Sequence, residues 1–546
     1  MAFTESDGKS ASGQPENGET GSDGKLKRAI GPGLLLLFIV GDVLGTGIYA
    51  LTGKVAEEVG GIVWLPFLVA FVVAGLTACS YLELVTKYPK AAGAALYTEK
   101  AFGIHFVTFL VAFAVMSSGL TSSSTAARAF AENFSTGFGL ELGGWAVTLV
   151  GLVFIAAIAL INMRGVGESV LVNAVFTCIE LTGLLIIVGI GLWVFGAGEA
   201  DVSKAFEFDS SEGVFWPVIA GTTLAFFAMV GFEDSVNMAE ETKDPSRSFP
   251  KMLFAGLTIA AVLYLVVSIV AISIVPVEEL AEGDTPLLKV VEAGAPGFPP
   301  WIFGLITMIA VGNSALINLL MASRLIYGMS EEGVLPSVLG KVNASRQTPV
   351  TAILFTSVLA AGLVTFVGAV PELGGTTAFL LLGVFTVVNV AVLVLRRDGV
   401  DHKHFRTPTA LPVLGALTCA FLLGPWTGRD PAQYMIAAVL LGIGVVLWMG
   451  GHDVLEGTIS GGDLAAFVFY AVVVAGSVGA ISEVYGDLQR AADAAERLSE
   501  LLASEPDIRS PALPERLPKS SPGLVKLENV TFHYPARPDT PTLEDI

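Results

Sequence analysis

The sequence predicts an all-α membrane protein with twelve transmembrane helices, and three observations predict it. Of its 546 residues, 53% are hydrophobic and only 15% are charged, whereas soluble domains carry about 25% charged residues. Apolar runs of about 18 to 25 residues, long enough to cross a bilayer, recur along the chain with short polar segments between them. Two of these runs, the first and the sixth, are interrupted in the middle.

Glycine, proline and charged residues mark the ends of the apolar runs, as loops require. The predicted spans are 32–52, 62–86, 104–126, 144–162, 170–196, 214–236, 252–276, 300–327, 349–370, 376–395, 408–425 and 433–450. Residues 29–450 therefore form the predicted membrane body. No cleavable signal is expected, because the first apolar run is too long and no small-residue cleavage site follows it.

Charge and basic residues indicate orientation and exclude one class of partner. With the N-terminus inside, about 17 lysines and arginines fall on the cytoplasmic side and about 5 on the other. Residues 1–28 are polar, and we expect them to form a disordered cytoplasmic tail. The net charge of −20 lies largely in outside loops and polar tails. No basic stripe or RNA-binding motif appears, so a nucleic-acid partner is not expected.

The first span is broken near its middle. Residues 33–51 read GLLLLFIVGDVLGTGIYAL, with Gly41-Asp42 and then Gly45-Thr46-Gly47 inside the apolar run. A bilayer-spanning helix must satisfy its own backbone polar groups, so a break is tolerated only where it lines a cavity or is buried in protein. In secondary transporters such breaks form substrate and ion sites near the midplane. The sequence therefore predicts a transporter with a substrate site at this break.

A second break lies in the sixth span, over residues 226–235. Spans one and six are equivalent if the first ten spans form two five-span repeats, about 29–196 and 212–396, followed by helices 11 and 12. An odd number of spans per repeat makes the two repeats opposite in orientation, and paired broken helices then point to the binding site. The alternative is two ordinary spans whose glycines serve helix packing.

A series of short motifs follows the same order along the chain as in one known family. The motifs are Gly45-x-Gly47-Ile48-Tyr49, Tyr81-x-Glu83-Leu84, Pro89 to Tyr97, Asn162-x-Arg164-Gly165, Phe226 to Asp234, Glu240 to Arg247, and Ser323 to Met329. With them, the body resembles the amino acid–polyamine–organocation (APC) superfamily. The resemblance implies a five-plus-five inverted repeat and amino acid transport. Leu51-Thr52-Gly53 after the first break is similar to bacterial relatives of cationic amino acid transporters.

An α-amino acid presents a carboxylate and an ammonium group to such a site. The helix that begins after the first break offers free N–H groups and a positive dipole end, which suit the carboxylate. Carbonyls of unwound stretches at 39–42 and 226–228 can accept from the ammonium, and phenylalanines can wall off the side chain. The predicted substrate-binding residues are Val40, Gly41, Asp42, Gly45, Thr46, Gly47, Ile48, Phe226, Phe227, Ala228, Gly231 and Phe232.

Two carboxylates at membrane depth are candidates for coupling to an ion, because ionisable residues there are functional hypotheses by default. Asp42 could receive the substrate ammonium or a coupling proton, or it could pair with a neighbour. Glu180 stands where the resemblance implies a lysine in proton-coupled relatives, so their mechanism does not carry over unchanged. Glu180 could bind Na⁺, be protonated in the cycle, or face a cationic substrate. For Glu83, Glu240 and Glu241, ion pairs with lysine or arginine are expected instead.

After residue 450 the sequence changes character. Residues 451–504 resemble the last membrane helix of an ABC exporter with its extension, and 505–546 resemble a linker and the start of a nucleotide-binding domain. No G-x-x-x-x-G-K-[ST] loop occurs, so ATP hydrolysis is not expected. The tail is either a remnant of gene fusion or frameshift, or a docking element for an ABC partner. Residues 464–481 are long enough to span a bilayer, which leaves the topology of the tail open.

These observations predict a secondary amino acid transporter of the cell inner (plasma) membrane that works by alternating access. Uptake coupled to H⁺ or Na⁺ is expected, and no cofactor beyond the coupling ion. The alternatives are an ABC-exporter fragment or partner, an amino acid exchanger, and a sensor. An enzyme is not expected, because the sequence has neither a G-x-S-x-G elbow nor a His/Cys metal spacing. Which amino acid is carried stays open.

Overall fold

The chain divides into two units, residues 1–480 and 481–546, and each is described by itself. The computed structural model describes residues 30–90, 93–140, 142–164, 166–198, 200–208, 213–239, 242–331, 338–343, 348–367, 370–460, 462–463, 466–467, 495, 497, 513, 520, 523–534 and 542–543. The predicted tail 1–28 and Glu240–Glu241 lie outside these residues.

The described part of the first unit is helical apart from isolated bridges such as Ile30 with Thr242. Its first half holds α1 (Pro32–Val43), α2 (Thr46–Val59), α3 (Trp64–Lys87), α4 (Gly93–Phe102), α5 (His105–Gly137), α6 (Gly144–Asn162) and α7 (Val166–Ala197). The 3₁₀ helix η1 (Val202–Phe206), α8 (Phe215–Ala225), η2 (Phe226–Met229), α9 (Phe232–Asn237), α10 (Pro245–Ile274), α11 (Val277–Ala281) and α12 (Pro286–Gly294) follow. The last elements are α13 (Pro300–Glu331), α14 (Val350–Phe366), α15 (Val370–Leu395), α16 (Ala410–Leu422), η4 (Pro425–Thr427) and α17 (Pro431–Leu455).

Most of the long helices can cross a membrane. Among the described residues, 10 helical segments are long and apolar enough to do so, counting α1 with α2 and α8 with α9 as one segment each. Two shorter apolar helices, α14 and α16, coincide with the predicted ninth and eleventh spans. The predicted all-α membrane fold is therefore confirmed, while the count of twelve spans stays a prediction. The third span is longer than predicted, since α5 continues to Gly137.

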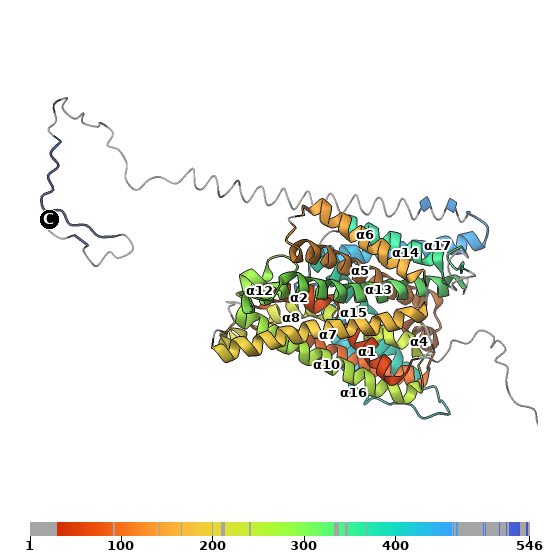
Figure 1. Cartoon of the computed structure of the whole chain (residues 1–546). Coiled ribbons are helices and arrows are strands. Elements are labelled where there is room, and N and C mark those ends of the chain that lie inside the picture. The colour runs from red at the N-terminus through yellow and green to blue at the C-terminus, as the bar shows by residue number, and fades with distance from the viewer. Residues whose placement is uncertain are drawn as a thin grey trace, which may run out of the picture. The chain divides into compact units, whose positions relative to one another are not determined.

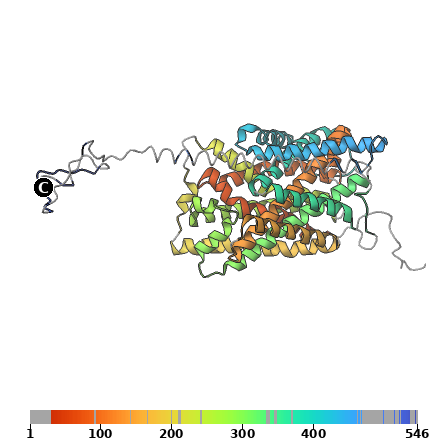
Figure 2. The same cartoon turned by 90° about the horizontal axis from the view of Figure 1, so that it is seen from above.

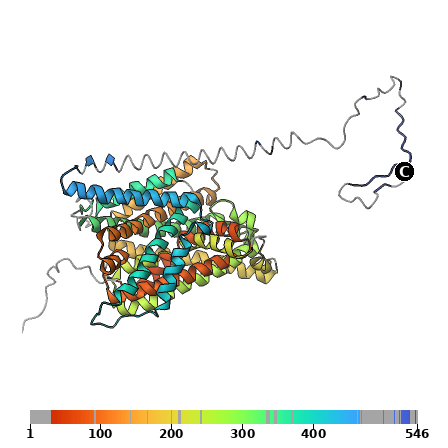
Figure 3. The ribbon, with the colours of Figure 1, turned by 180° about the vertical axis from the view of Figure 1, so that it is seen from behind.

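The long helices run side by side, and α1 packs against both α7 and α10 (Figures 1 and 2). Helix α5 packs along α13 and α15 (Figure 3). Small residues allow the close approach of α5 and α13. A Cβ added to Gly137 would lie 3.2 Å from the Cα of Gly304, and one added to Gly119 would lie 3.1 Å from the carbonyl oxygen of Asn318. Such contacts drive helix association in lipid, where apolar burial gives little net gain.

Exposed tryptophans mark one side of the first unit. They stand at the start of α6, the end of α7, the start of α8 and the start of α13, and in η4 between α16 and α17: Trp145, Trp193, Trp216, Trp301 and Trp426. Because consecutive membrane helices cross in alternating directions, these ends share one side. Tryptophan is enriched at membrane–water interfaces, so we place one interface here. We refer to it as the tryptophan side, and to the opposite side as the α4 side.

A buried ion pair connects the loop after α15 to the end of α3. Arg396 donates to both carboxylate oxygens of Glu83, at 2.8 and 2.7 Å, and the backbone N–H of Thr407 donates to the same carboxylate at 2.9 Å. The hydrogen bonds to Glu83 raise the pKa of the Arg396 guanidinium. The ion pair expected for Glu83 is therefore confirmed, and it holds α3 and α15 together at the α4 side.

The second unit offers little described structure. Phe532 and Leu543 form an isolated antiparallel bridge, in which the Phe532 N–H donates to the Leu543 carbonyl at 2.8 Å. The rings of Phe532 and Tyr534 lie 5.2 Å apart. Most of the predicted exporter-like helix, including residues 468–494, lies outside the described residues.

We predict that Glu83→Gln destabilises the protein by about 3 kcal/mol, because removing one partner of a buried pair leaves the other charge uncompensated. Thermal unfolding of the detergent-solubilised protein measures the change.

Lys54→Gln is the matched control, since it removes the exposed pair of Lys54 with Glu57 at 3.2 Å. Such surface pairs contribute about 0 to 1 kcal/mol. Equal shifts in the two variants would show that the buried pair has no special role.

Candidate functional site

Two helices are interrupted at the same depth of the first unit. Helix α1 ends at Val43 and α2 begins at Thr46, which leaves Leu44 and Gly45 outside helix. In the sixth span, α8 tightens into the 3₁₀ helix η2, and Val230 and Gly231 separate η2 from α9. The structure therefore breaks both helices close to where the sequence predicts. Residues 39–42 and 226–228, however, are not unwound as expected, because the first stretch belongs to α1, which continues to Val43, and the second belongs to the 3₁₀ helix η2.

The two breaks touch each other. A Cβ added to Gly47 would lie 2.4 Å from the Cα of Ala228, and one added to Gly231 would lie 2.9 Å from the carbonyl carbon of Asp42. Gly231 also has a φ of 116°, which residues with a side chain rarely adopt. Only glycine fits at either position. This close approach fixes the first and sixth spans against each other at their interruptions.

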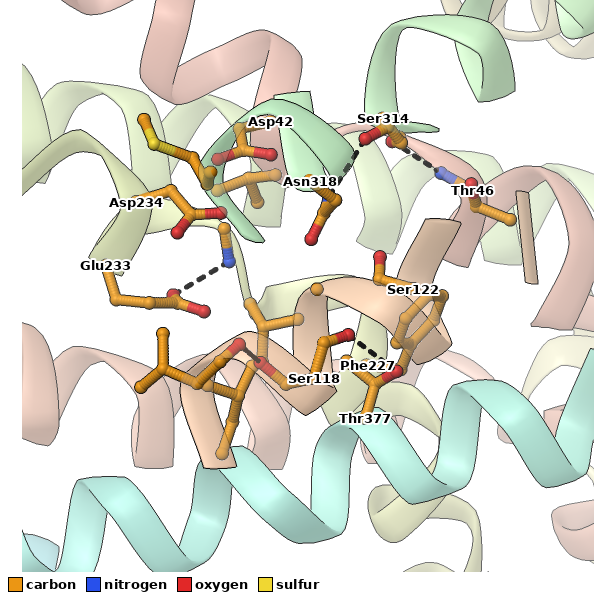
Figure 4. Close-up of a pocket in the computed structure, with 18 of the residues that line it drawn as sticks. Asp42, Thr46, Ser118, Ser122, Phe227, Glu233, Asp234, Ser314, Asn318 and Thr377 are labelled. Atoms are coloured by element: carbon orange, nitrogen blue, oxygen red, sulfur yellow. Dashed lines mark hydrogen bonds between the residues drawn. The ribbon is translucent and has the colours of Figure 1, made fainter. Parts of the chain in front are cut away.

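A buried cavity lies between the breaks (Figure 4). Its walls come from the α1–α2 break, the η2–α9 break, α5, α13 and α15. Its free volume is about 30 Å³, roughly what two or three ordered waters need. The walls of the cavity therefore lie close together. A molecule larger than a few waters can enter only if the walls move apart.

One side of the cavity carries hydroxyl, amide and backbone N–H groups. The N–H of Thr46, at the first turn of α2, donates to Ser314 Oγ at 3.3 Å, and Asn318 Nδ2 donates to the Ser314 carbonyl at 3.0 Å. Ser118 and Ser122 from α5 line the same cavity. Thr46 Oγ1 is buried without a hydrogen-bond partner among the described residues. These groups are neutral and can donate to an anionic group.

The other side of the cavity is acidic. Asp42, Glu233 and Asp234 all line it and are 5%, 6% and 7% exposed. Glu233 Oε2 accepts from the N–H of Gly231 at 2.8 Å, whereas neither carboxylate oxygen of Asp42 has a hydrogen-bond partner among the described residues. No lysine, arginine or histidine is among the described residues that line the cavity.

Half of the predicted substrate-binding residues line the cavity. These are Asp42, Gly45, Thr46, Gly47, Phe227 and Gly231. The others are buried beside it: Val40, Gly41, Ile48, Phe226, Ala228 and Phe232. Of the three phenylalanines, Phe227 alone reaches the cavity among the described residues. The rings of Phe226 and Phe232 pack on Phe385 of α15, with centroids 6.0 and 5.4 Å away.

Glu180 does not line the cavity. It lies in α7, which packs against α1. The hydroxyl of Tyr49 in α2 donates to the Glu180 backbone carbonyl at 2.8 Å. Nearer the start of α7, Asn173 donates to Asn313 at 3.0 Å, and Asn313 donates to the Gly41 carbonyl at 3.4 Å. Both carboxylate oxygens of Glu180 are buried and have no partner among the described residues. The structure therefore keeps this buried carboxylate apart from the cavity.

Sequence reasoning did not select the polar residues of α5 and α13, nor Glu233 and Asp234. A signal existed for both groups. Glu233 and Asp234 are charged residues inside an apolar span, which marks a functional position by default. Helix α5 carries a hydroxyl-rich stretch, Ser117 to Thr125, within a membrane-length helix. The described residues contain no group of three or more His, Cys, Asp or Glu that could hold a metal ion.

Comparison with known proteins identifies one family. The model of the family described as "Amino acid permease" matches residues 34–450. The branched-chain amino acid permease BcaP of Bacillus subtilis is 26% identical over 427 residues, which cover 74% of this chain and 89% of that protein. The methylthioribose transporter of Bacillus subtilis is 28% identical, covering 79% and 95%. The vacuolar cationic amino acid transporter 4 of Arabidopsis thaliana is 30% identical, covering 74% and 73%.

We predict that Gly231→Ala destabilises the protein by about 1 to 3 kcal/mol, because the positive φ and the contact with Asp42 both oppose a side chain. The midpoint of thermal unfolding in detergent measures this.

Gly75→Ala in α3 is the control. A Cβ there meets no atom within 4 Å, and alanine favours the helix by up to about 1 kcal/mol. If Gly231→Ala were as stable as Gly75→Ala, the tight contact between the breaks would be refuted.

Proposed function

Since the chain belongs to the amino acid permease family, we propose that it is a secondary active transporter that carries amino acids across the membrane by alternating access. The observation that carries this proposal is the pair of helix breaks that meet around one buried cavity. In transporters, interrupted helices of this kind hold the substrate near the midplane. The small volume of the cavity supports a cycle in which the walls open to one side at a time.

We assign the neutral side of the cavity to the substrate carboxylate. The N–H groups of Thr46 and Gly47 belong to the first turn of α2, where unsatisfied donors and the positive end of the helix dipole favour an anion. The Thr46 N–H now donates to Ser314 Oγ, and a bound carboxylate would take over that donor. Phe227 is the proposed wall of the side-chain pocket. The ammonium group is proposed to meet carbonyls just before the two breaks, at Gly41 to Asp42 near the end of α1 and at Phe226 to Ala228 in η2.

We propose that uptake is coupled to a gradient of H⁺ or Na⁺, with Glu180 and Asp42 as the coupling carboxylates. Both are buried at membrane depth with unpartnered oxygens in the described part of the chain. Burying such a group without a partner is costly, so a functional reason for keeping it is expected. Helix α7 packs against α1, and the Glu180 carbonyl accepts from Tyr49 of α2, so we expect a change of charge at Glu180 to act on the first break.

The finer architecture is also a proposal. Twelve spans result if α14 and α16 cross the membrane with the ten longer segments, and the repeats 29–196 and 212–396 then have opposite orientation. The basic residues support a cytoplasmic N-terminus in the plasma membrane. Residues 451–546 lie beyond the family match. Their resemblance to an ABC-exporter helix (451–504) and to the start of a nucleotide-binding domain (505–546) rests on sequence alone.

We predict that the purified protein in proteoliposomes accumulates a labelled amino acid when either a pH gradient or a Na⁺ gradient is imposed. Glu180→Gln should abolish accumulation against a gradient, because an uncharged amide cannot bind and release the coupling cation. Uptake is measured with the two gradients applied separately, over a panel of neutral, acidic and basic amino acids.

The control is Glu278→Gln, an exposed carboxylate of α11, which should transport like the wild type. Exchange that is indifferent to both gradients would contradict coupling but leave amino acid transport intact. Absence of flux for every amino acid, with binding preserved, would instead identify a sensor.

A further inference from the structure

We propose that Asp42, Glu233 and Asp234 form a cation subsite at one end of the cavity. There, a proton held in the empty carrier is exchanged for the ammonium or guanidinium group on the side chain of a cationic amino acid. The inference rests on the proposed function, because it assigns a substrate class to the same site. It makes Glu233 and Asp234 part of the site.

The cavity is polarised along its length. In Figure 4 the three carboxylates lie on one side, and Thr46 and Ser122 lie on the other. A molecule with a carboxylate at one end and a cation at the other matches this arrangement. A cationic amino acid has that shape, because its side chain carries the second positive charge away from the α-carbon. A neutral amino acid would leave the acidic side unused.

The acidic side has no cation of its own among the described residues. Each of the three side chains is more than nine-tenths buried, and both oxygens of Asp42 lack a hydrogen-bond partner in the described structure. The Gly231 N–H offsets part of the charge of Glu233 alone. Three ionised carboxylates in a buried pocket repel one another and lose their hydration. The empty carrier therefore keeps at least one of them protonated.

The other groups that face this cluster supply no positive charge. Among the described residues, the titratable ones within electrostatic range are Tyr81 from α3 and Glu180 from α7. The hydroxyl of Tyr264 in α10 donates a hydrogen bond to the Val43 carbonyl. The cavity residues from α5, α13 and α15 are all uncharged. A cation must come from outside the protein, as a proton or as part of the substrate.

The carboxylates suit an organic cation better than a metal ion. The described structure has no group of three or more His, Cys, Asp or Glu side chains that could hold a metal ion. An ammonium or a guanidinium group carries several N–H donors, which can reach more than one carboxylate at once. The subsite thus suits the head group of a lysine-like or arginine-like side chain.

A second cavity continues from the acidic side toward the α4 side. It shares Glu233, Val115 and Leu325 with the first cavity and is otherwise lined by residues that include Ala94 and Ala95 of α4. Glu233 is the only charged residue among the described residues that line this second cavity. A cation released from the subsite therefore meets the same carboxylate on its way to the α4 side.

The exchange balances in atoms and charge. When the basic side chain arrives, the O–H bond of the protonated carboxyl breaks and the proton passes to bulk water. The carboxylate then accepts N–H hydrogen bonds from the substrate, which keeps all its own protons. One positive charge replaces another, and no oxidant or co-reactant is needed. The displaced proton is not co-transported with a cationic substrate, so coupling for that substrate falls to Glu180. A neutral amino acid leaves the proton in place.

The test compares L-lysine with L-norleucine, which has the same side-chain length without the ammonium group. Each is titrated into the full-length detergent-solubilised protein in weakly buffered solution at pH 7 with a pH-indicator dye, and binding is measured in parallel by calorimetry. Lysine should release about one proton per molecule bound, since the two cations compete for one site. Norleucine should bind without proton release.

Variants separate the subsite from the rest of the cavity. Asp234→Asn should lower the affinity for lysine by about tenfold or more, as expected for a lost hydrogen bond between charged groups, and should reduce proton release. Its affinity for norleucine should fall much less than its affinity for lysine. Glu278→Gln should behave as the wild type for both ligands.

The wild-type comparison decides the matter even if Asp234→Asn does not fold. Lysine binding without proton release, equal release by both ligands, or binding of norleucine alone would overturn the subsite and leave the proposed transport function standing. If no amino acid bound at all, the proposed function itself would be contradicted, and this inference with it.

Discussion

The rule that every backbone N–H and C=O must be satisfied inside a membrane governs this structure. Breaking a helix there exposes polar groups that lipid cannot satisfy, and this chain breaks two helices and sets the breaks against each other. Gly47 lies on Ala228, and Gly231 lies on Asp42. Freed groups then find partners in neighbouring helices, as the Thr46 N–H does at Ser314. The cavity exists because these two interruptions coincide.

The positions of the helices and of both breaks can be predicted from the sequence. They depend on the length and apolarity of single segments and on glycines inside apolar runs. What could not be read is which face of a helix meets which neighbour. Phe226 and Phe232 look equivalent to Phe227 in the sequence, yet they pack on Phe385. Ser314 and Asn318 reach the site only through the packing of α13 on α5, which no pattern within one segment reveals.

The two sides of the cavity differ in charge. Neutral donors gather at the start of α2, carboxylates gather at α1 and α9, and Glu180 stands apart behind α1. The first region suits a substrate carboxylate and the second suits a cation, while a coupling role for Glu180, outside the cavity, is our proposal. The ion pair of Glu83 with Arg396 holds α3 to the loop after α15 at the α4 side.

We propose that one substrate molecule occupies the cavity between the two breaks. A structure of the protein determined with a saturating transported amino acid tests it most directly. We predict ligand density between the first turn of α2 and Gly231, with the carboxylate within hydrogen-bonding distance of the Thr46 and Gly47 N–H groups. Density elsewhere in the bundle, with this cavity empty and Thr46 still bonded to Ser314, would contradict it.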